Sequence, residues 1–96
     1  MDVLTDEQIS ERLVDVPGWT RQGDSIVHVE TLTDFKAAML YVGAVAYLAE
    51  ADNHHPDFTI QWNKVTLTLS THSAGGLTVN DFALAKKVNG LSKAAG

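Results

Sequence analysis

The sequence predicts an α+β fold in which a four-stranded antiparallel sheet carries three helices packed on one face. Three observations support this prediction. Two segments, residues 19–32 and 58–70, alternate apolar and polar residues around a short turn, as β-hairpins do. Three other segments have the apolar spacing and the end signals of helices. The resulting order, α-β-β-α-β-β-α, favours one sheet built from both hairpins, with the helices covering it.

The first predicted helix begins at a capping box. Thr5 is the N-cap residue, and Gln8, three residues later, is its reciprocal partner. Ile9 and Leu13 then lie on one helical face at i, i+4 spacing. The run 16–18, Val-Pro-Gly, ends this helix.

The first hairpin pairs residues 19–22 with residues 25–32 around a tight turn at Gly23-Asp24. His28 lies in the middle of its second strand. Because no acidic cluster lies near it in the sequence, we interpret His28 as a structural residue.

Thr33 or Asp34 caps the second predicted helix, which runs to about Ala51. Asn53 tolerates the left-handed conformation at its C-terminal end, and Pro56 follows where a helix cannot continue. The apolar side chains of this helix cover nearly its whole circumference: Phe35, Met39, Leu40, Tyr41, Val42, Val45, Ala46, Tyr47, Leu48 and Ala49. Since a chain of 96 residues cannot cover one helix on every side, we expect a homodimer or homotetramer.

The second hairpin has one apolar and one polar face. Phe58, Ile60 and Trp62 point to the same side of its first strand, and Asn63-Lys64 is predicted to form its two-residue turn. The strand after the turn alternates in the same way over residues 65–70. This pattern predicts a half-buried antiparallel pair.

The third helix is predicted to start after Thr78, its N-cap residue. Leu77 and Phe82 are spaced as a hydrophobic staple around this cap, and Asp81 occupies the third helical position. Asn89-Gly90 is predicted to end the helix.

Composition excludes several classes of protein. The 96 residues fit one domain, residues 1–96, and the formal charge of −5 argues against a nucleic-acid-binding surface. With no cysteine, disulfides and thiolate chemistry are excluded. The longest apolar run, residues 37–49, is shorter than the roughly 20 residues of a membrane span. No secretory signal opens the chain, so we expect a cytoplasmic protein with no membrane partner.

Acids and histidines gather at the predicted element ends. His54 and His55 follow the second helix, His72 follows the last strand, and Asp81 lies in the first turn of the third helix. Side chains at element ends can converge on one pocket, and imidazole transfers protons near neutral pH. Each also has a simpler interpretation: an exposed loop histidine, or for Asp81 an acid favoured by the helix dipole. Adjacent histidines lack the i, i+4 spacing of a helical zinc motif, so no metal site is expected.

The spacing of these residues resembles that of the pterin-4a-carbinolamine dehydratase family. The run Glu-Ala-Asp-Asn-His-His-Pro at residues 50–56 is followed by Trp62, His72 and Asp81, which fills every position of the family's motif. The resemblance extends over about residues 4–91, nearly the whole chain.

The flanking residues support this resemblance. Gly-Trp at 18–19, Asp-Phe at 34–35, Trp-Asn-Lys-Val at 62–65 and Gly-Leu-Thr at 76–78 all look like family sequence. The chain departs from the pattern at Phe58, where members often carry Trp, and at Asn53, a slot that varies. Phe58 and Trp62 share the parity of Ile60, so one or both belong to the core and do not stack on a pterin.

The resemblance implies a hydro-lyase of tetrahydrobiopterin recycling that works by histidine general acid–base catalysis. Family members convert 4a-hydroxy-tetrahydropterin to quinonoid dihydropterin and water, with no cofactor or metal. By this resemblance the catalytic set is His54, His55 and His72. The implied substrate-binding set is Glu50, His54, His55, Pro56, Thr71, His72, Ser73, Ala74 and Asp81.

Further roles follow from position. Glu50 lies one turn before His54 and is expected to orient that imidazole, with His54 the preferred base at the ring nitrogen. Asp81 either hydrogen-bonds His72 or only caps its helix. The alternative function is that of a dehydratase-like module for protein binding, assembly or coactivation, without catalysis. Such a module would be free to lose His54 or His72, and this sequence has kept both.

Overall fold

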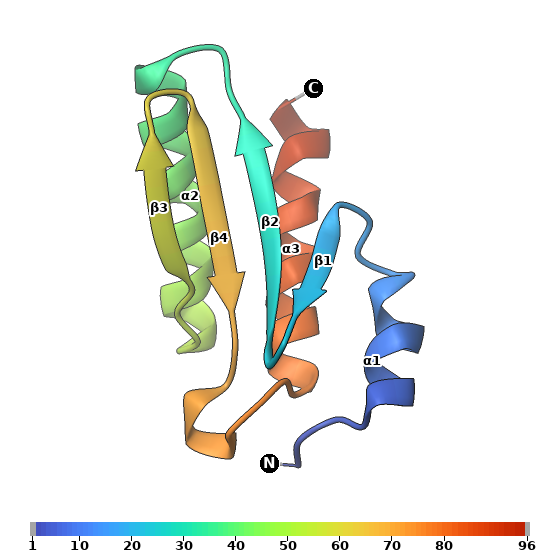
Figure 1. The fold of residues 1–96 in the computed structure, drawn as a ribbon. Helices are drawn as coiled ribbons and strands as arrows, with labels where there is room; N and C mark the ends of the chain where they lie inside the picture. Colours follow the sequence, from blue (N-terminus) through green and yellow to red (C-terminus); the bar gives the residue numbers. More distant parts are fainter. Residues whose placement is uncertain (1, 96) are drawn as a thin grey trace.

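Two β-hairpins form one antiparallel sheet in this protein (Figure 1). A computed structural model describes residues 2–95, with side chains described for residues 2–91. Its elements are α1 (Asp6–Leu13), β1 (Trp19–Gln22), β2 (Ser25–Thr31), α2 (Phe35–Asp52), β3 (Asp57–Gln61), β4 (Lys64–Leu69), the 3₁₀ turn η1 (His72–Ala74) and α3 (Val79–Ala95). The strand order is β1-β2-β4-β3, and the predicted fold class and element order are confirmed.

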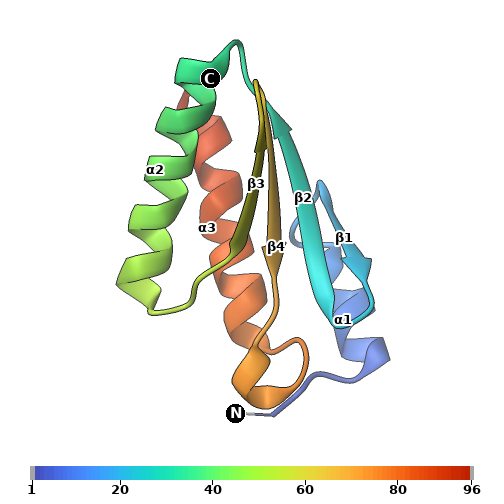
Figure 2. The same ribbon diagram turned by 60° about the vertical axis from the view of Figure 1, so that its left-hand side comes forward.

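Two of the three helices in the described residues, α2 and α3, cover one face of this sheet (Figure 2). Figure 2 shows α2 and α3 lying side by side on the same face, while Figure 1 shows α1 beside the edge formed by β1. The central pairing joins the two hairpins, with Ile26 opposite Leu69 at one end and Thr31 opposite Lys64 at the other. None of the helices in the described residues is long and apolar enough to cross a bilayer.

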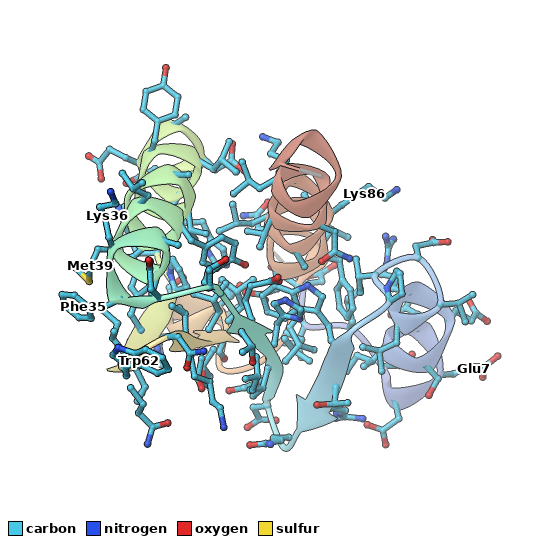
Figure 3. The ribbon with its side chains drawn as sticks, turned by 90° about the horizontal axis from the view of Figure 1, so that it is seen from above. Glu7, Phe35, Lys36, Met39, Trp62 and Lys86 are labelled. Atoms are coloured by element: carbon cyan, nitrogen blue, oxygen red, sulfur yellow. The ribbon has the colours of Figure 1, made fainter. Side chains whose placement is uncertain are left out.

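The turn between β3 and β4 differs from the prediction by one residue. It is formed by Trp62 and Asn63, and Lys64 already belongs to β4. Trp62 has a φ of 51° and its side chain is 65% exposed, so it neither continues the strand nor enters the core. Figure 3 shows its ring near Phe35 and Met39. Trp62 follows the last residue of β3, whereas His55 precedes the first, so the two lie at opposite ends of the strand. The sequence predicts that Phe58, Trp62 or both belong to the core, and Trp62 does not.

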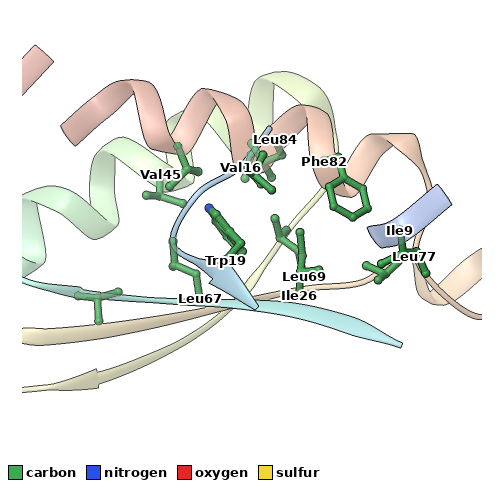
Figure 4. Close-up of a cluster of buried hydrophobic side chains, with 14 of the residues drawn as sticks. Ile9, Val16, Trp19, Ile26, Val45, Leu67, Leu69, Leu77, Phe82 and Leu84 are labelled. Carbon is green, nitrogen blue, oxygen red and sulfur yellow. The ribbon is translucent and has the colours of Figure 1, made fainter. Parts of the chain in front are cut away.

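The hydrophobic core lies between the sheet and the two long helices (Figure 4). The sheet contributes buried residues at alternate positions of β4, namely Val65, Leu67 and Leu69, as their alternation predicts. Phe58 is half-buried against this core. The other buried apolar residues are Ile9, Val16, Trp19, Ile26, Ala38, Val45, Ala49, Leu77, Phe82, Leu84, Ala85 and Val88.

Three helix ends form as the sequence predicts. Thr5 and Gln8 make both hydrogen bonds of a capping box, and Asp34, one of the two predicted candidates, caps α2 through the amide of Ala37. Asn53 ends α2 in the left-handed conformation, with φ at 50°. This residue reverses the chain direction and delivers the two histidines that follow.

The predicted end of α3 is wrong, because the helix continues through Asn89 and Gly90. Instead of capping, the Asn89 side chain joins distant parts of the chain. Its Oδ1 accepts a hydrogen bond from Trp19 Nε1 at 2.9 Å, and its Nδ2 donates to the carbonyl of Pro17 at 3.0 Å. These bonds tie α3 to the start of β1.

His28 anchors the first hairpin. Its Nδ1 lies 2.9 Å from the carbonyl of Gly18, and its Nε2 lies 2.8 Å from Glu30 Oε1. The ring also stacks on Trp19 with centroids 5.2 Å apart. The acidic residue Glu30 therefore lies next to His28 on the same face of β2, although the sequence predicts no acidic cluster near this histidine. These contacts agree with a structural role for His28.

Tyr41 carries a buried hydroxyl with no hydrogen-bond partner among the described residues. Burial and the nearby charge of Glu30 raise the pKa of its phenol. We expect Tyr41→Phe to keep or raise the free energy of unfolding, by about 1 kcal/mol, because an unpaired buried hydroxyl costs free energy. Because the pKa of this phenol is higher in the folded than in the unfolded protein, the free energy of unfolding is unaffected by it below a pH of roughly 10. Above that pH the free energy of unfolding falls.

The variant should therefore also lose less stability than the parent on going from pH 7 to pH 11. Urea unfolding at both pH values measures this. A variant that is destabilised by more than about 1 kcal/mol at pH 7 would show that the hydroxyl has a partner.

Candidate active site

His54 lies in the short segment between the end of α2 and the start of β3. The left-handed Asn53 turns the chain, and the amide of His54 donates to the carbonyl of Ala49 at 3.0 Å. Its ring points toward the start of α3, where Nε2 lies 2.6 Å from Asp81 Oδ1. The His54 side chain is 11% exposed and that of Asp81 is fully buried. The two side chains form a buried acid–imidazole pair across 27 residues of sequence.

Both carboxylate oxygens of Asp81 have hydrogen-bond partners. Its Oδ2 accepts hydrogen bonds from Thr71 Oγ1 at 2.8 Å and from the amide of Thr78 at 2.9 Å, in addition to the contact of its Oδ1 with His54. The bond to Thr78 is the helix-capping role that its position in α3 predicts. Of the two alternatives predicted for Asp81, the helix cap is present and the bond to His72 is not, since the carboxylate bonds to His54 as well. Three donors satisfy a carboxylate that has no contact with solvent.

This network indicates which partner donates the hydrogen bond between His54 and Asp81. The carboxylate of Asp81 acts as an acceptor toward Thr71 and Thr78, so His54 Nε2 is the donor in the shared hydrogen bond. A neutral imidazole that donates from Nε2 carries its free lone pair on Nδ1. His54 is thereby oriented as a proton acceptor at Nδ1.

Glu50 pairs with His55 and not with His54, so the expectation that it orients His54 is wrong. Glu50 Oε2 lies 2.9 Å from His55 Nε2, and both side chains are more than half exposed. Pro56, next in the chain, is buried. The sequence distance of one helical turn suggested the wrong partner because the left-handed Asn53 rotates His54 away from the axis of α2.

His72 follows Thr71 directly and starts η1. Its side chain is exposed and makes no hydrogen bond within the described part of the chain. Ser73 is exposed and Ala74 is half-buried in the same turn. A bridge between Thr71 and Gly76 closes this loop, so His72 is displayed from a fixed base next to the Asp81 network.

A cavity of about 300 Å³ opens beside His54. Its remaining lining comes from Asp52, Asn80, Ala83 and Lys87. At this wall Lys87 Nζ lies 2.6 Å from Asp52 Oδ1, which joins α2 to α3. Sequence reasoning missed the three α3 residues, although their spacing, i, i+3 and i+7, places them on one helical face next to Asp81.

No metal-binding group is apparent in the residues that the structure describes. Nowhere in residues 2–91 do three His, Asp or Glu side chains gather as metal ligands would. The charged and imidazole groups of the site are instead hydrogen-bonded in pairs, His54 with Asp81 and His55 with Glu50.

Comparisons with known proteins cover nearly all of this chain. A family model described as "Pterin 4 alpha carbinolamine dehydratase" matches residues 2–91. A protein of Roseiflexus castenholzii is 54% identical over 87 residues, which is 91% of this chain and 94% of that protein. One of Nocardia farcinica is 49% identical over 92 residues, 96% of this chain and 97% of that protein. Both are named "Putative pterin-4-alpha-carbinolamine dehydratase".

A solved structure has the same fold. The crystal structure titled as a transcriptional coactivator/pterin dehydratase from Brucella melitensis superimposes with a TM-score of 0.89 at 32% sequence identity. The superposition covers 94% of this chain and 98% of that one.

Proposed function

This chain belongs to the pterin 4 alpha carbinolamine dehydratase family, and from this premise we propose that it dehydrates a 4a-hydroxy-tetrahydropterin to the quinonoid dihydropterin. Enzymes with this activity are hydro-lyases. The finer proposal concerns the groups that move the protons. It places a base at His54, held by Asp81, and a proton donor at His72.

One observation carries this proposal: His54, held by the buried Asp81, lines a cavity large enough to admit a ligand. At about 300 Å³ the cavity lies at the lower end of the usual range for small-molecule pockets. A buried carboxylate that accepts from an imidazole fixes the tautomer of that ring and stabilises the imidazolium that forms on proton uptake. The hydroxyl of Thr71 and the amide of Thr78 hold the carboxylate in turn.

The reaction needs two proton transfers: one proton leaves a ring nitrogen of the pterin, and one is delivered to the departing hydroxyl. His54 Nδ1 removes the proton from the ring nitrogen next to the carbinol carbon. The freed electron pair forms the carbon–nitrogen double bond, and the bond from carbon to the hydroxyl breaks. The departing hydroxyl receives a proton and leaves as water. General acid–base groups of this kind each contribute about 10²–10⁴-fold to a rate.

His72 is proposed as the proton donor because of its place beside the same network. It follows Thr71, whose hydroxyl is bound to Asp81, and its exposed ring has no other partner in the described residues. The proposed role of His55 is to contact the substrate with Glu50 as its partner.

The direct test is the decay of a 4a-hydroxy-tetrahydropterin followed by stopped-flow absorbance. With the protein present, decay should be faster than the spontaneous reaction and proportional to protein concentration. A non-catalytic binding module would leave the spontaneous rate unchanged at every concentration, and that result would refute the enzyme proposal.

We also propose that the protein is a homodimer or homotetramer assembled through α2. On this helix Leu40 is 69% exposed and Tyr47 77% exposed, which leaves large apolar side chains uncovered in one protomer. Light scattering at micromolar concentration should give the mass of a dimer or tetramer. Leu40→Glu should shift that mass toward the monomer by introducing a buried charge.

Val14→Glu is the matched control for this prediction, because Val14 is 80% exposed at the end of α1, on a different surface. It should leave the mass unchanged. A monomeric parent protein would refute the assembly proposal.

A further inference from the structure

A second and larger hollow adjoins the cavity beside His54. Its volume is about 590 Å³, and it lies between α1 and α3. It shares Asn80, Ala83 and Lys87 with the smaller cavity. Its other lining residues are Arg12, Asp15, Val16, Val79, Phe82 and Lys86. The two hollows are therefore neighbours along the exposed face of α3, and together they are called the groove below.

The chemistry of the larger part differs from that of the smaller. Its floor includes the buried apolar side chains of Val16 and Phe82. Its rim carries Arg12 from the last turn of α1 and Lys86 from α3. Figure 3 shows Lys86 projecting from the side of α3 that faces α1. An apolar floor beneath a charged rim suits a ligand with an apolar stem and a charged head.

The charges of the rim favour an anion. Three of the lining residues are cationic, in a chain that has only seven Lys and Arg and a formal charge of −5. Lys87 is neutralised by Asp52. Within the described residues Arg12 and Lys86 form no ion pair, and they face a single lining acid, Asp15. The groove thus concentrates positive charge on an otherwise acidic protein.

We infer that this groove binds the substituent of the pterin ring, and that this substituent consists of an apolar stem with an anionic head. The inference rests on the proposed function, since the ring would occupy the smaller cavity beside His54. It names the substrate class as a pterin with an acidic side chain. A carboxylate on an aryl stem and a phosphate ester share the chemistry that Arg12 and Lys86 would recognise.

Three stable oxidised pterins test the inference by calorimetric titration. They are 6-hydroxymethylpterin with a neutral substituent, its phosphate ester, and folic acid, whose aryl stem ends in carboxylates. We expect at least one anionic pterin to bind more tightly than the neutral one, and the preference to shrink as salt is raised. Which anion is preferred identifies the source of the charge, and the apolar floor favours the aryl carboxylate.

Two variants assign the preference to the groove. Arg12→Ala and Lys86→Ala should each weaken binding of the preferred anionic pterin by about two- to fivefold, the range of partly exposed ion pairs. Binding of the neutral pterin should change less than that of the anion. Lys64→Ala is the matched control: it removes the same charge from β4, and Lys64 lines neither part of the groove.

The outcomes separate this inference from the proposed function. Equal affinity for neutral and anionic pterins, or equal loss of anion binding in Lys64→Ala, would overturn the inference, as would binding of none of the three. Dehydration of a substrate with a neutral side chain is measured on the parent protein in the same preparation. If the anion preference and its loss are found but dehydration is not accelerated, the groove stands and the catalytic proposal falls.

Discussion

His54→Ala should lower the rate of dehydration by about 10²–10⁴-fold, the contribution typical of a general base. The variant removes the only imidazole that is held by the buried Asp81 in the described residues. The variant should be less stable than the parent, because the buried Asp81 loses one of its three donors. It should still fold, since His54 belongs to neither the core nor the strand pairings. Stopped-flow decay of 4a-hydroxy-tetrahydropterin measures the rate, and circular dichroism checks the fold.

His72→Ala should reduce the rate by at least tenfold if its ring delivers the second proton. The double variant of His54 and His72 should lose less than the product of the single losses, because groups that act as one unit are not additive. His28→Ala serves as the control: its ring is bound to Gly18 and Glu30, away from this network. Assayed below its melting temperature, it should keep nearly the parent rate.

The site assignment is wrong if His54→Ala and His72→Ala both retain full activity with unchanged circular dichroism. Loss of activity in His54→Ala alone would keep the base and remove His72 as the donor. His55, paired with Glu50 at 2.9 Å, would then be the remaining imidazole to replace.

Asp81→Ala should destabilise the protein by about 3–5 kcal/mol, because it leaves three donors without their acceptor at about 1–3 kcal/mol for each buried one. The variant leaves the hydroxyl of Thr71, the amide of Thr78 and His54 Nε2 without their acceptor. Urea unfolding measures the loss. A cost below about 1 kcal/mol would contradict the buried network, because each unsatisfied group alone costs about that much.

Asp81→Asn separates positioning from stability. The amide keeps the shape and one acceptor oxygen, so it should unfold at a higher urea concentration than Asp81→Ala while its dehydration rate falls at least tenfold. Nitrogen chemical shifts of the His54 ring should show loss of the Nε2–H tautomer in this variant. A purely structural Asp81 would leave both the tautomer and the pH profile of the rate unchanged.

The fold could be predicted from local patterns because local interactions decide most of it. Alternation through Val65, Leu67 and Leu69 identified a half-buried strand, and Thr5 and Asn53 marked helix ends through bonds made within a few residues. The errors occur where distant residues compete with those signals. Asn89 reads as a helix stop, but Trp19 and the carbonyl of Pro17 bind its side chain and the helix continues.

The candidate site shows the same limit. The sequence groups Glu50, His54, His72 and Asp81 into one set, but it pairs Glu50 with the wrong histidine and does not identify His54 as the partner of Asp81. Which acid contacts which histidine depends on how α2, β4 and α3 pack against one another. The spacing of residues along the chain does not contain this information. The groove lined by Arg12 was missed for the same reason, since α1 meets α3 only in the folded protein.

The β3–β4 hairpin has a consequence for how this protein can diverge through evolution. Because Asp57 pairs with Thr68, the hairpin brings the chain just before β3 next to the chain just after β4, and α3 begins there. His54, Thr71 and Asp81 therefore all come from the second half of the sequence. The first half supplies packing against this unit and, through α1, one wall of the larger groove. Substitutions in α1 can therefore reshape that wall without changing any of the residues proposed to transfer protons.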